Sequence, residues 1–180
     1  MTDVTTTPSQ TVGPFLAIGL PWADGSDLVA DGTPGALVIE GVVTDGDRVA
    51  VPDALIEIWQ ADPDGRFPHP GDPRGASTYA GFRNFGRCPT DATGRYWFRT
   101  LAPGPVDDEQ APHIDVLVFA RGLVKQLVTR LYLPGATDDD PLLRELTEVE
   151  RAKLTGVPTG GGVRFDIRLQ GDGETPFFAL

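Results

Sequence analysis

Short apolar runs separated by turn-forming residues follow one another along most of the chain. The runs are rich in Val, Ile, Leu and aromatic residues, which favour strands, and Gly, Pro or Asp closes most of them. In the last run apolar and polar residues alternate strictly, so one face of that strand should be buried. Strands are expected over residues 36–44, 52–60, 95–100, 111–119, 123–133 and 163–170. About six or seven short strands with turns between them predict an all-β sandwich.

The segment near residues 140–155 is the one with helical signals. Asp140 followed by Pro141 is a typical N-cap and first helical residue. Thr147 and Glu150 have the spacing of a capping box, so a second helical turn can begin there. We therefore expect a short helical insert in an otherwise β-rich chain.

Residues 1–20 are expected to form an N-terminal arm. They begin with a polar stretch, bend at Gly13-Pro14 and continue with an apolar run. Two interpretations stay open at this point, because such an arm can cap its own domain or reach a partner subunit. Residues 21–180 are sufficient for a single β-sandwich domain with a sizeable core. Within it, residues 61–86 form a long irregular connection of the kind that is usually functional or disordered.

Charge and composition exclude several classes of protein. The formal net charge is −11, which argues against nucleic acids and anionic membrane surfaces, because both need clustered Lys and Arg. A small anion would need a site built around a particular Arg or Lys. The single cysteine permits no intrachain disulfide, and no apolar run approaches the ~20 residues of a membrane helix. The N-terminus has no signal-peptide pattern, so a cytoplasmic location is expected.

His113 and Asp115 are the first candidates for site chemistry. They are two residues apart on an expected strand, so their side chains leave the same face ~7 Å apart, as two ligands of a metal would. Two ordinary polar residues at a strand edge show the same spacing, so both interpretations stay open. Arg130 stands in an apolar run and is either an edge residue or a charge held for an anion. His69, between two prolines, is more typical of a solvated loop.

Three groups of residues occur in a set order: the sequence DALIEIWQAD at 53–62, the sequences GRCPTD and GRYWFRT with Pro103-Gly104 at 86–104, and Pro-His-Ile at 112–114. In this order they resemble the intradiol ring-cleaving dioxygenases, and the resemblance extends from residue 8 to residue 178. It implies a prealbumin-like β-sandwich with an N-terminal arm. It also implies an enzyme family in which a non-haem ferric ion binds a catechol and O₂ opens the ring between the two hydroxyls.

The residues that hold iron in this family are mostly replaced in this chain. The two tyrosine positions carry Phe67 and Val106, and the His-x-His pair is His113 with Asp115. A catalytic arginine position falls on Gln110. Phe and Val offer no oxygen to a metal, and one His with one Asp cannot hold Fe³⁺ alone. The resemblance therefore implies no metal bound by this chain and no catalytic residue of its own.

Within the family, the chain is similar to a branch in which an iron-free chain pairs with an iron-bearing chain. The segments SQTVGPF at 9–15, TRLY at 129–132 and RFDIRLQG at 164–171 carry this part of the resemblance. It implies a hetero-oligomeric enzyme of aromatic compound catabolism, with Fe(III) bound by the partner β chain and with a small aromatic acid and O₂ as substrates. Residues 1–20 would contact the partner. The residues that would border the substrate pocket are Thr11, Gly13, Pro14 and Arg130.

Two alternatives remain beside this hypothesis. The first is a stand-alone binding or scaffold domain whose metal site has been lost, which would be indifferent to any partner chain. The second is a different metalloenzyme that uses His113 and Asp115, although no further ligands are evident in the sequence.

Overall fold

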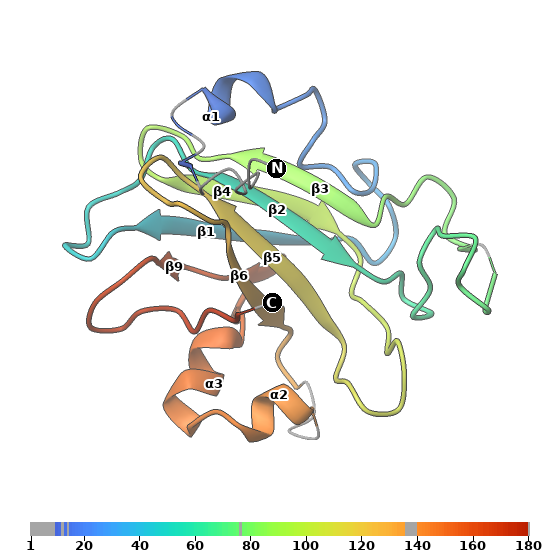
Figure 1. Ribbon diagram of the computed structural model, residues 1–180. Helices are drawn as coiled ribbons and strands as arrows, with labels where there is room; N and C mark the ends of the chain where they lie inside the picture. The colour runs from blue at the N-terminus through green and yellow to red at the C-terminus, as the bar shows by residue number, and fades with distance from the viewer. Residues whose placement is uncertain (1–9, 12, 14, 76, 136–139, 180) are drawn as a thin grey trace, which may run out of the picture.

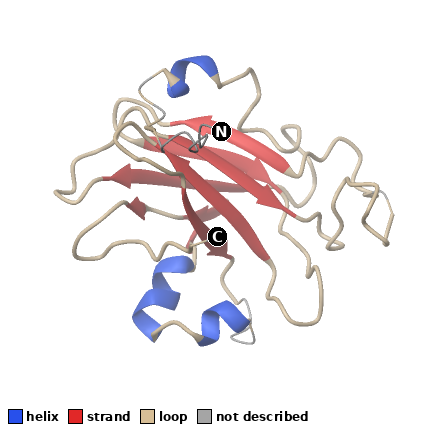
Figure 2. Ribbon diagram, viewed as in Figure 1, coloured by secondary structure: helices blue, strands red, loops and turns tan. Residues whose placement is uncertain are grey.

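The chain folds into two β-sheets packed face to face (Figure 1, Figure 2). The computed structural model describes residues 10–11, 13, 15–75, 77–135 and 140–179. In one sheet the strand order is β4 (Arg95–Thr100), β1 (Leu37–Thr44), β8 (Gly162–Arg164) and β7 (Val157–Thr159), and β9 (Ile167–Arg168) also pairs with β1. In the other it is β3 (Phe85–Pro89), β2 (Leu55–Gln60), β5 (His113–Phe119) and β6 (Leu127–Tyr132). The predicted all-β sandwich is confirmed.

The main core lies between the inner faces of the two sheets. In β4 and β5, buried and more exposed residues alternate, as expected for strands with one face on the core. Ile39 of β1, Phe98 of β4 and Val116 of β5 are among its members, each at most 1% exposed. Because the buried residues of β5 are the even-numbered ones, His113 and Asp115 point to the outer face of their sheet.

The helical insert begins where its capping residues predicted. Asp140 caps α2 (Pro141–Arg144), and its side chain accepts hydrogen bonds from two backbone N–H groups of the helix. Thr147 and Glu150 form a complete capping box at the start of α3 (Glu148–Leu154). The two helices lie beyond one end of the sandwich (Figure 1), and their leucines form a small second core with Ala111 and Tyr132.

The predicted strand over residues 163–170 is wrong as a single element. Its apolar residues face inward as expected, but it is divided into β8 and β9. At the break, the carbonyl oxygen of Phe165 approaches Gly41 of β1 so closely that a Cβ on Gly41 would lie 1.9 Å from it. The Tyr96 hydroxyl donates to this same oxygen, and the Asp166 carboxylate accepts from the Val42 N–H in place of a backbone carbonyl. Side chains of other strands thus interrupt the ladder, which alternation alone cannot predict.

Four further elements differ from the sequence-based expectation. Strands β3 and β7 lie in segments expected as loops, since each contains Pro or Gly and neither alternates. Strand β6 begins four residues later than expected, after a turn that follows Gly122. The apolar end of the expected arm forms a short helix, α1 (Leu16–Gly19).

Within the part of the chain that the structure describes, no helix has the length and apolar character needed to cross a membrane.

Candidate functional site

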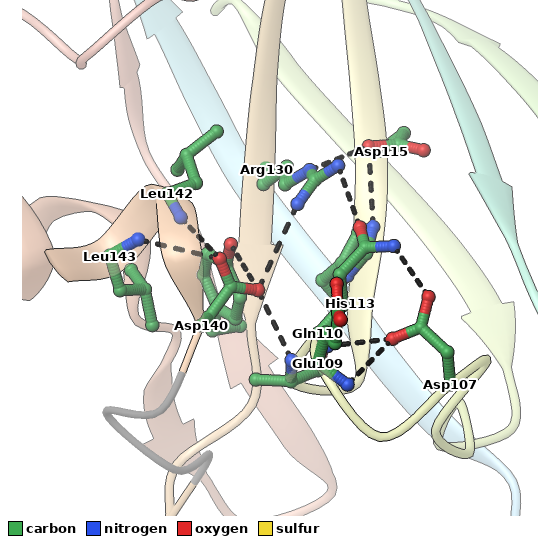
Figure 3. A network of polar contacts seen from close by, with 11 residues as sticks. Asp107, Glu109, Gln110, His113, Asp115, Arg130, Asp140, Leu142 and Leu143 are labelled. Atoms are coloured by element: carbon green, nitrogen blue, oxygen red, sulfur yellow. Dashed lines mark hydrogen bonds and ion pairs between the residues drawn. The ribbon is translucent and has the colours of Figure 1, made fainter. Parts of the chain in front are cut away.

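The pairing of β5 with β6 brings the candidate residues together on one outer face (Figure 3). In the antiparallel register Asp115 lies opposite Arg130, and His113 lies opposite Tyr132. Side chains of directly opposed residues share a face of the sheet, so these four side chains are neighbours. The prediction that His113 and Asp115 share a face is confirmed, and the tertiary structure adds Arg130 to the pair.

Arg130 is the centre of a polar network on this face. Its Nε donates to Asp115 Oδ1 over 3.1 Å, and its Nη2 donates to Gln110 Oε1 over 3.3 Å. Its Nη1 lies 3.8 Å from Asp140 Oδ2, and only 17% of the side chain is exposed. Burial alone would lower the pKa of Arg130, but its hydrogen bond with Tyr132 and the Asp115 carboxylate outweigh burial and raise the pKa. The guanidinium is therefore a fixed cation with carboxylates on two sides.

Asp140 connects this network to the helical insert. Its side chain is fully buried and makes the N-cap bonds of α2, including 2.8 Å from Leu142 N. Its second oxygen accepts from the Ala111 N–H over 3.1 Å and from the Tyr132 hydroxyl over 3.3 Å. Burial raises the pKa of Tyr132 to about 12, so this hydroxyl keeps its proton and remains a donor. One carboxylate thus fixes the start of β5, the end of β6 and the start of α2.

Gln110, where the family resemblance implies a catalytic arginine position, is also held in place. Its Nε2 donates to Asp107 Oδ2 over 2.9 Å, while Asp107 Oδ1 accepts from the backbone N–H groups of Glu109 and Gln110. The side-chain bond from Gln110, followed by these backbone bonds, lowers the pKa of Asp107. Gln110 therefore bridges Asp107 to Arg130, and it holds the guanidinium from the side opposite its ion pair with Asp140 (Figure 3).

His113 lies at a position where the family resemblance implies a metal ligand. Its Nδ1 lies 2.8 Å from the carbonyl oxygen of Ala111, which requires this nitrogen to carry the proton when the ring is neutral. Its Nε2 then faces Asp115 Oδ1 at 3.6 Å, and the side chain is only 10% exposed. The imidazole is thus turned toward a carboxylate that Arg130 already binds.

The loops that carry Phe67 and Val106, where the family resemblance implies tyrosine ligands, are tied together. The Phe67 N–H donates to Asp72 Oδ2 over 2.9 Å, and Arg74, which pairs with Asp72, donates to the carbonyl oxygen of Val106 over 2.7 Å. Asp72 accepts bonds first from the Arg74 side chain and then from backbone N–H groups, which lower its pKa. Asp72 and Arg74 were not singled out from the sequence. The spacing Asp-Pro-Arg inside the long loop, with one residue between acid and base, is the signal that would have found them.

The donor set of this face does not fit an iron ion. Phe67 and Val106 supply no oxygen or nitrogen side-chain donor, and the Asp115 carboxylate is engaged by Arg130. Across residues 10–179, apart from the few positions left undescribed, no group of three or more His, Cys, Asp or Glu side chains is placed to hold a metal ion. Two donors that already bind other protein groups are too few for a ferric site.

The expected pocket residues of the arm lie apart from Arg130 within this chain. Thr11 Oγ1 accepts a hydrogen bond of 2.9 Å from the Gly122 N–H, so the arm meets the turn between β5 and β6. Gly13 has φ +70°, a conformation that favours glycine. Arg130 pairs with Asp115 near the other end of β5, and Pro14 lies outside the described residues. The structure thus brings Arg130, His113, Asp115 and Gln110 together but does not join Thr11 or Gly13 to them.

An aromatic cluster continues this face across the sheet. Phe85, Trp59, Asp115 and Arg130 follow one another in register over β3, β2, β5 and β6. Trp22 stacks on Phe85 with ring centroids 5.9 Å apart, and Trp59 lies 5.3 Å from the same ring. Sequence reasoning did not find this cluster, because its members come from three separate segments.

Comparison with known proteins gives consistent results. A family model described as "Dioxygenase" matches residues 21–171. The chain is 39% identical to the protocatechuate 3,4-dioxygenase alpha chain of Burkholderia cepacia, with 99% of each chain covered. It is 35% identical to the alpha chain of that name from Pseudomonas putida, covering 96% of this chain and 95% of the relative. It is 34% identical to the beta chain from Burkholderia cepacia, covering 78% of this chain and 66% of the relative.

Solved structures agree with the fold. The dioxygenase domain of a carbohydrate-binding fusion protein from Streptomyces sp. SirexAA-E is 27% identical with a TM-score of 0.58, covering 81% of this chain and 87% of that one. Catechol 1,2-dioxygenase from Pseudomonas arvilla C-1 has the same TM-score at 24% identity, covering 83% of this chain and 58% of that one, and supports the fold alone. With the family match over residues 21–171 and the near full-length relatives, this chain belongs to the intradiol ring-cleaving dioxygenase family.

Proposed function

We propose that the chain is the iron-free α subunit of a heteromeric protocatechuate 3,4-dioxygenase. In this proposal a partner β subunit binds Fe(III), and the complex cleaves protocatechuate with O₂ to 3-carboxy-cis,cis-muconate. One observation carries the proposal: a chain similar over its whole length to alpha chains has His113 and Asp115 tied into a protein network instead of a metal site. The subunit therefore contributes binding surface and pocket walls, and the partner contributes the metal.

The outer face supports an interface with a partner. In α1 and the residues that flank it, Phe15 and Ile18 are 77% and 76% exposed. Trp22 and Trp59 of the aromatic cluster are also exposed, at 40% and 45%. Large apolar side chains gathered on one region of a surface mark interaction sites, and aromatic residues are enriched in the centre of such sites. We propose that residues 1–20 and this cluster contact the β subunit.

Arg130 has donors left for a carboxylate. A guanidinium has five N–H groups, and its hydrogen bonds with Asp115, Gln110 and Tyr132 use three of them. In a chain of net charge −11, a cation fixed on the interface face is a suitable partner for an aromatic acid. We propose that Arg130 binds the ring carboxylate of protocatechuate, while Thr11, Gly13 and Pro14 present backbone and a small side chain to the flat ring.

Kinetics of the complex test this role for Arg130. An Arg130→Ala variant, co-expressed with the β subunit, should raise KM for protocatechuate about 10-fold or more, the size of a lost charge-assisted bond. Its iron content should be unchanged, because the metal is held by the partner. Arg121→Ala is the matched control, since Arg121 is an exposed arginine paired with Asp53 outside this face. An unchanged KM in the Arg130 variant contradicts the assignment.

Metal content and partner dependence test the subunit role itself. The chain purified alone should hold far less than one iron per chain and show little ring cleavage, and co-expression with a β subunit should restore activity. About one tightly bound iron in the isolated chain, with a colour that responds to catechols, would overturn the proposal. A stable chain that ignores the β subunit would favour the alternative of a stand-alone binding or scaffold domain.

A further inference from the structure

A groove separate from the β5–β6 face lies beside the sheet that contains β1, β8 and β9. It has a volume of about 620 Å³ and is formed by β1, β8 and β9, the end of α3 and residues 173–175. Val42 and Val157 are among its apolar lining residues, while the side chains of Phe165 and Ile167 behind it are buried in the main core. The size is within the range of small-molecule sites, which is about 300–1,000 Å³.

This groove collects positive charge in an acidic chain. Arg48, Lys153, Arg164 and Arg168 line it, together with a single carboxylate, Asp166. Four of the chain's 15 basic residues thus face one groove, although acidic residues number 26 in the whole sequence. Clustering of this kind concentrates a positive potential in a concave region that an anion can enter.

Among the described residues, three of these four cations make no ion pair with a carboxylate, although the charge of Lys153 contributes to lowering the pKa of Glu150 on the same helix. Arg164 binds Asp166 through Nε at 2.9 Å. Arg168 donates only to the carbonyl oxygens of Gln170 and Gly46, and Lys153 donates to the carbonyl oxygen of Glu174. Carbonyl oxygens orient these side chains but carry no net charge. Within the described ranges, Arg48, Lys153 and Arg168 therefore have no carboxylate in an ion pair.

Arg48 is held in the groove wall by an unfavourable backbone. It lies at the tip of the hairpin that follows β1, with φ +66°, where a residue with a side chain is uncommon and strained. The hairpin closes through Asp45, whose side chain accepts from the Asp47 and Val49 N–H groups. Among the residues the structure describes, the Arg48 guanidinium has no hydrogen-bond or ion-pair partner. A strained residue with a free cation facing a groove is the kind of outlier that points to a ligand.

We propose that this groove binds a small organic polyanion, an apolar carbon body that carries two or more carboxylates. Val157, which is 62% exposed, and Val42 offer apolar contacts to the carbon body. Arg48 and Arg168 can each bind a carboxylate through two N–H groups of the guanidinium, and Lys153 offers a single ammonium group. The site is separate from the β5–β6 face and does not depend on the proposed subunit role.

Direct binding to the full chain tests the site without any ring-cleavage chemistry. The probe is cis-aconitate, an unsaturated tricarboxylate, measured by isothermal titration calorimetry at low and at physiological salt. We expect one saturable site per chain, weakened by salt as for any charge-driven contact. Benzoate has an apolar body with one carboxylate and should bind at least 10-fold more weakly. Equal affinity for inorganic phosphate would show that charge alone is bound and would overturn the assignment to an organic polycarboxylate.

Two variants locate the binding on the groove. Arg48→Gly removes the guanidinium and suits the backbone, so it should fold normally and weaken cis-aconitate binding about 10-fold or more. Lys153→Gln removes a second cation without touching the hairpin and should also weaken binding. Lys125→Gln is the matched control, because Lys125 is an exposed cation in the connection between β5 and β6. No saturable binding to the unaltered chain, or affinities that Arg48→Gly and Lys153→Gln leave unchanged, contradicts the proposal.

Discussion

The β5–β6 face and the groove beside β9 each gather arginines, but they treat positive charge in opposite ways. On the β5–β6 face, Arg130 is mostly buried and lies between Asp115 and Asp140. In the groove, Arg48, Lys153 and Arg168 face solvent or carbonyl oxygens. Buried charges are costly unless they are paired, whereas exposed charges can stay unpaired at little cost. The first region therefore has a charge balance that folding requires, and the second has charge left for an external anion.

Among its described residues, the β5–β6 face also lacks the free donors that a metal ion would need. A metal site needs several donors that converge and are otherwise unused. In this chain Phe67 and Val106 provide no donor, and Asp115 is bound by Arg130. The loops that carry Phe67 and Val106 are nonetheless kept together by Asp72 and Arg74.

The largest effect on stability is expected from a substitution in the buried network of the β5–β6 face. Asp140→Ala should lower the free energy of unfolding by about 3–5 kcal/mol, because it removes the α2 cap and leaves Arg130 and two buried donors without this acceptor. Urea unfolding measures the change. Arg164→Ala is the matched control in the groove, because it removes an ion pair but leaves the Asp166 bond to the Val42 N–H in place. Both side chains of that pair are about half exposed, so it should contribute less than about 1 kcal/mol. Equal losses from the two variants would contradict the distinction between the regions.

A second, smaller effect concerns alkaline pH. The pKa of Tyr132 is raised to about 12 from a usual value near 10, chiefly by burial. The folded state therefore keeps this proton while the unfolded state releases it. Its contribution to stability is complete below pH 10 and is lost as the pH rises toward 12, by up to about 1.4 kcal/mol per pH unit.

Unfolding titrations of the unaltered chain and of Tyr132→Phe at pH 8 to 12 check this expectation. The variant should lose less stability over that window, because it has no phenol to ionise. The same slope in both chains would show that Tyr132 does not titrate differently in the folded state.

The smallest effect on stability is expected from a substitution of Arg48 in the groove. Arg48→Gly should raise the free energy of unfolding by about 1 kcal/mol, because glycine adopts φ +66° without the strain that a side chain imposes. Arg48→Ala removes the same charge but keeps the strained backbone, so it separates the two causes. If the alanine variant is stabilised as much as the glycine variant, charge repulsion in the groove, and not backbone strain, is the cause.

Several elements could be predicted because their signals are local. Strand β4 has the bounds expected from its apolar run, and both helices of the insert begin at the caps that Asp140 and Thr147 form. The shared face of His113 and Asp115 follows from the two-residue period of a strand. The break between β8 and β9 could not be predicted, because the Tyr96 hydroxyl and Gly41 that cause it come from other strands.

The sequence alone determined the class of fold, the capped helices and the absence of oxygen donors at residues 67 and 106, since these depend on residue type and near neighbours. The tertiary structure decided what the remaining polar residues do. Asp115 meets Arg130 through the register of β5 with β6, and Arg130 meets Asp140 because the insert folds back on that face. The groove exists because Arg48, Lys153 and Arg168 converge from a hairpin, a helix and a strand. Contacts between segments so distant in sequence depend on how the sheets and helices pack, and no local pattern records that packing.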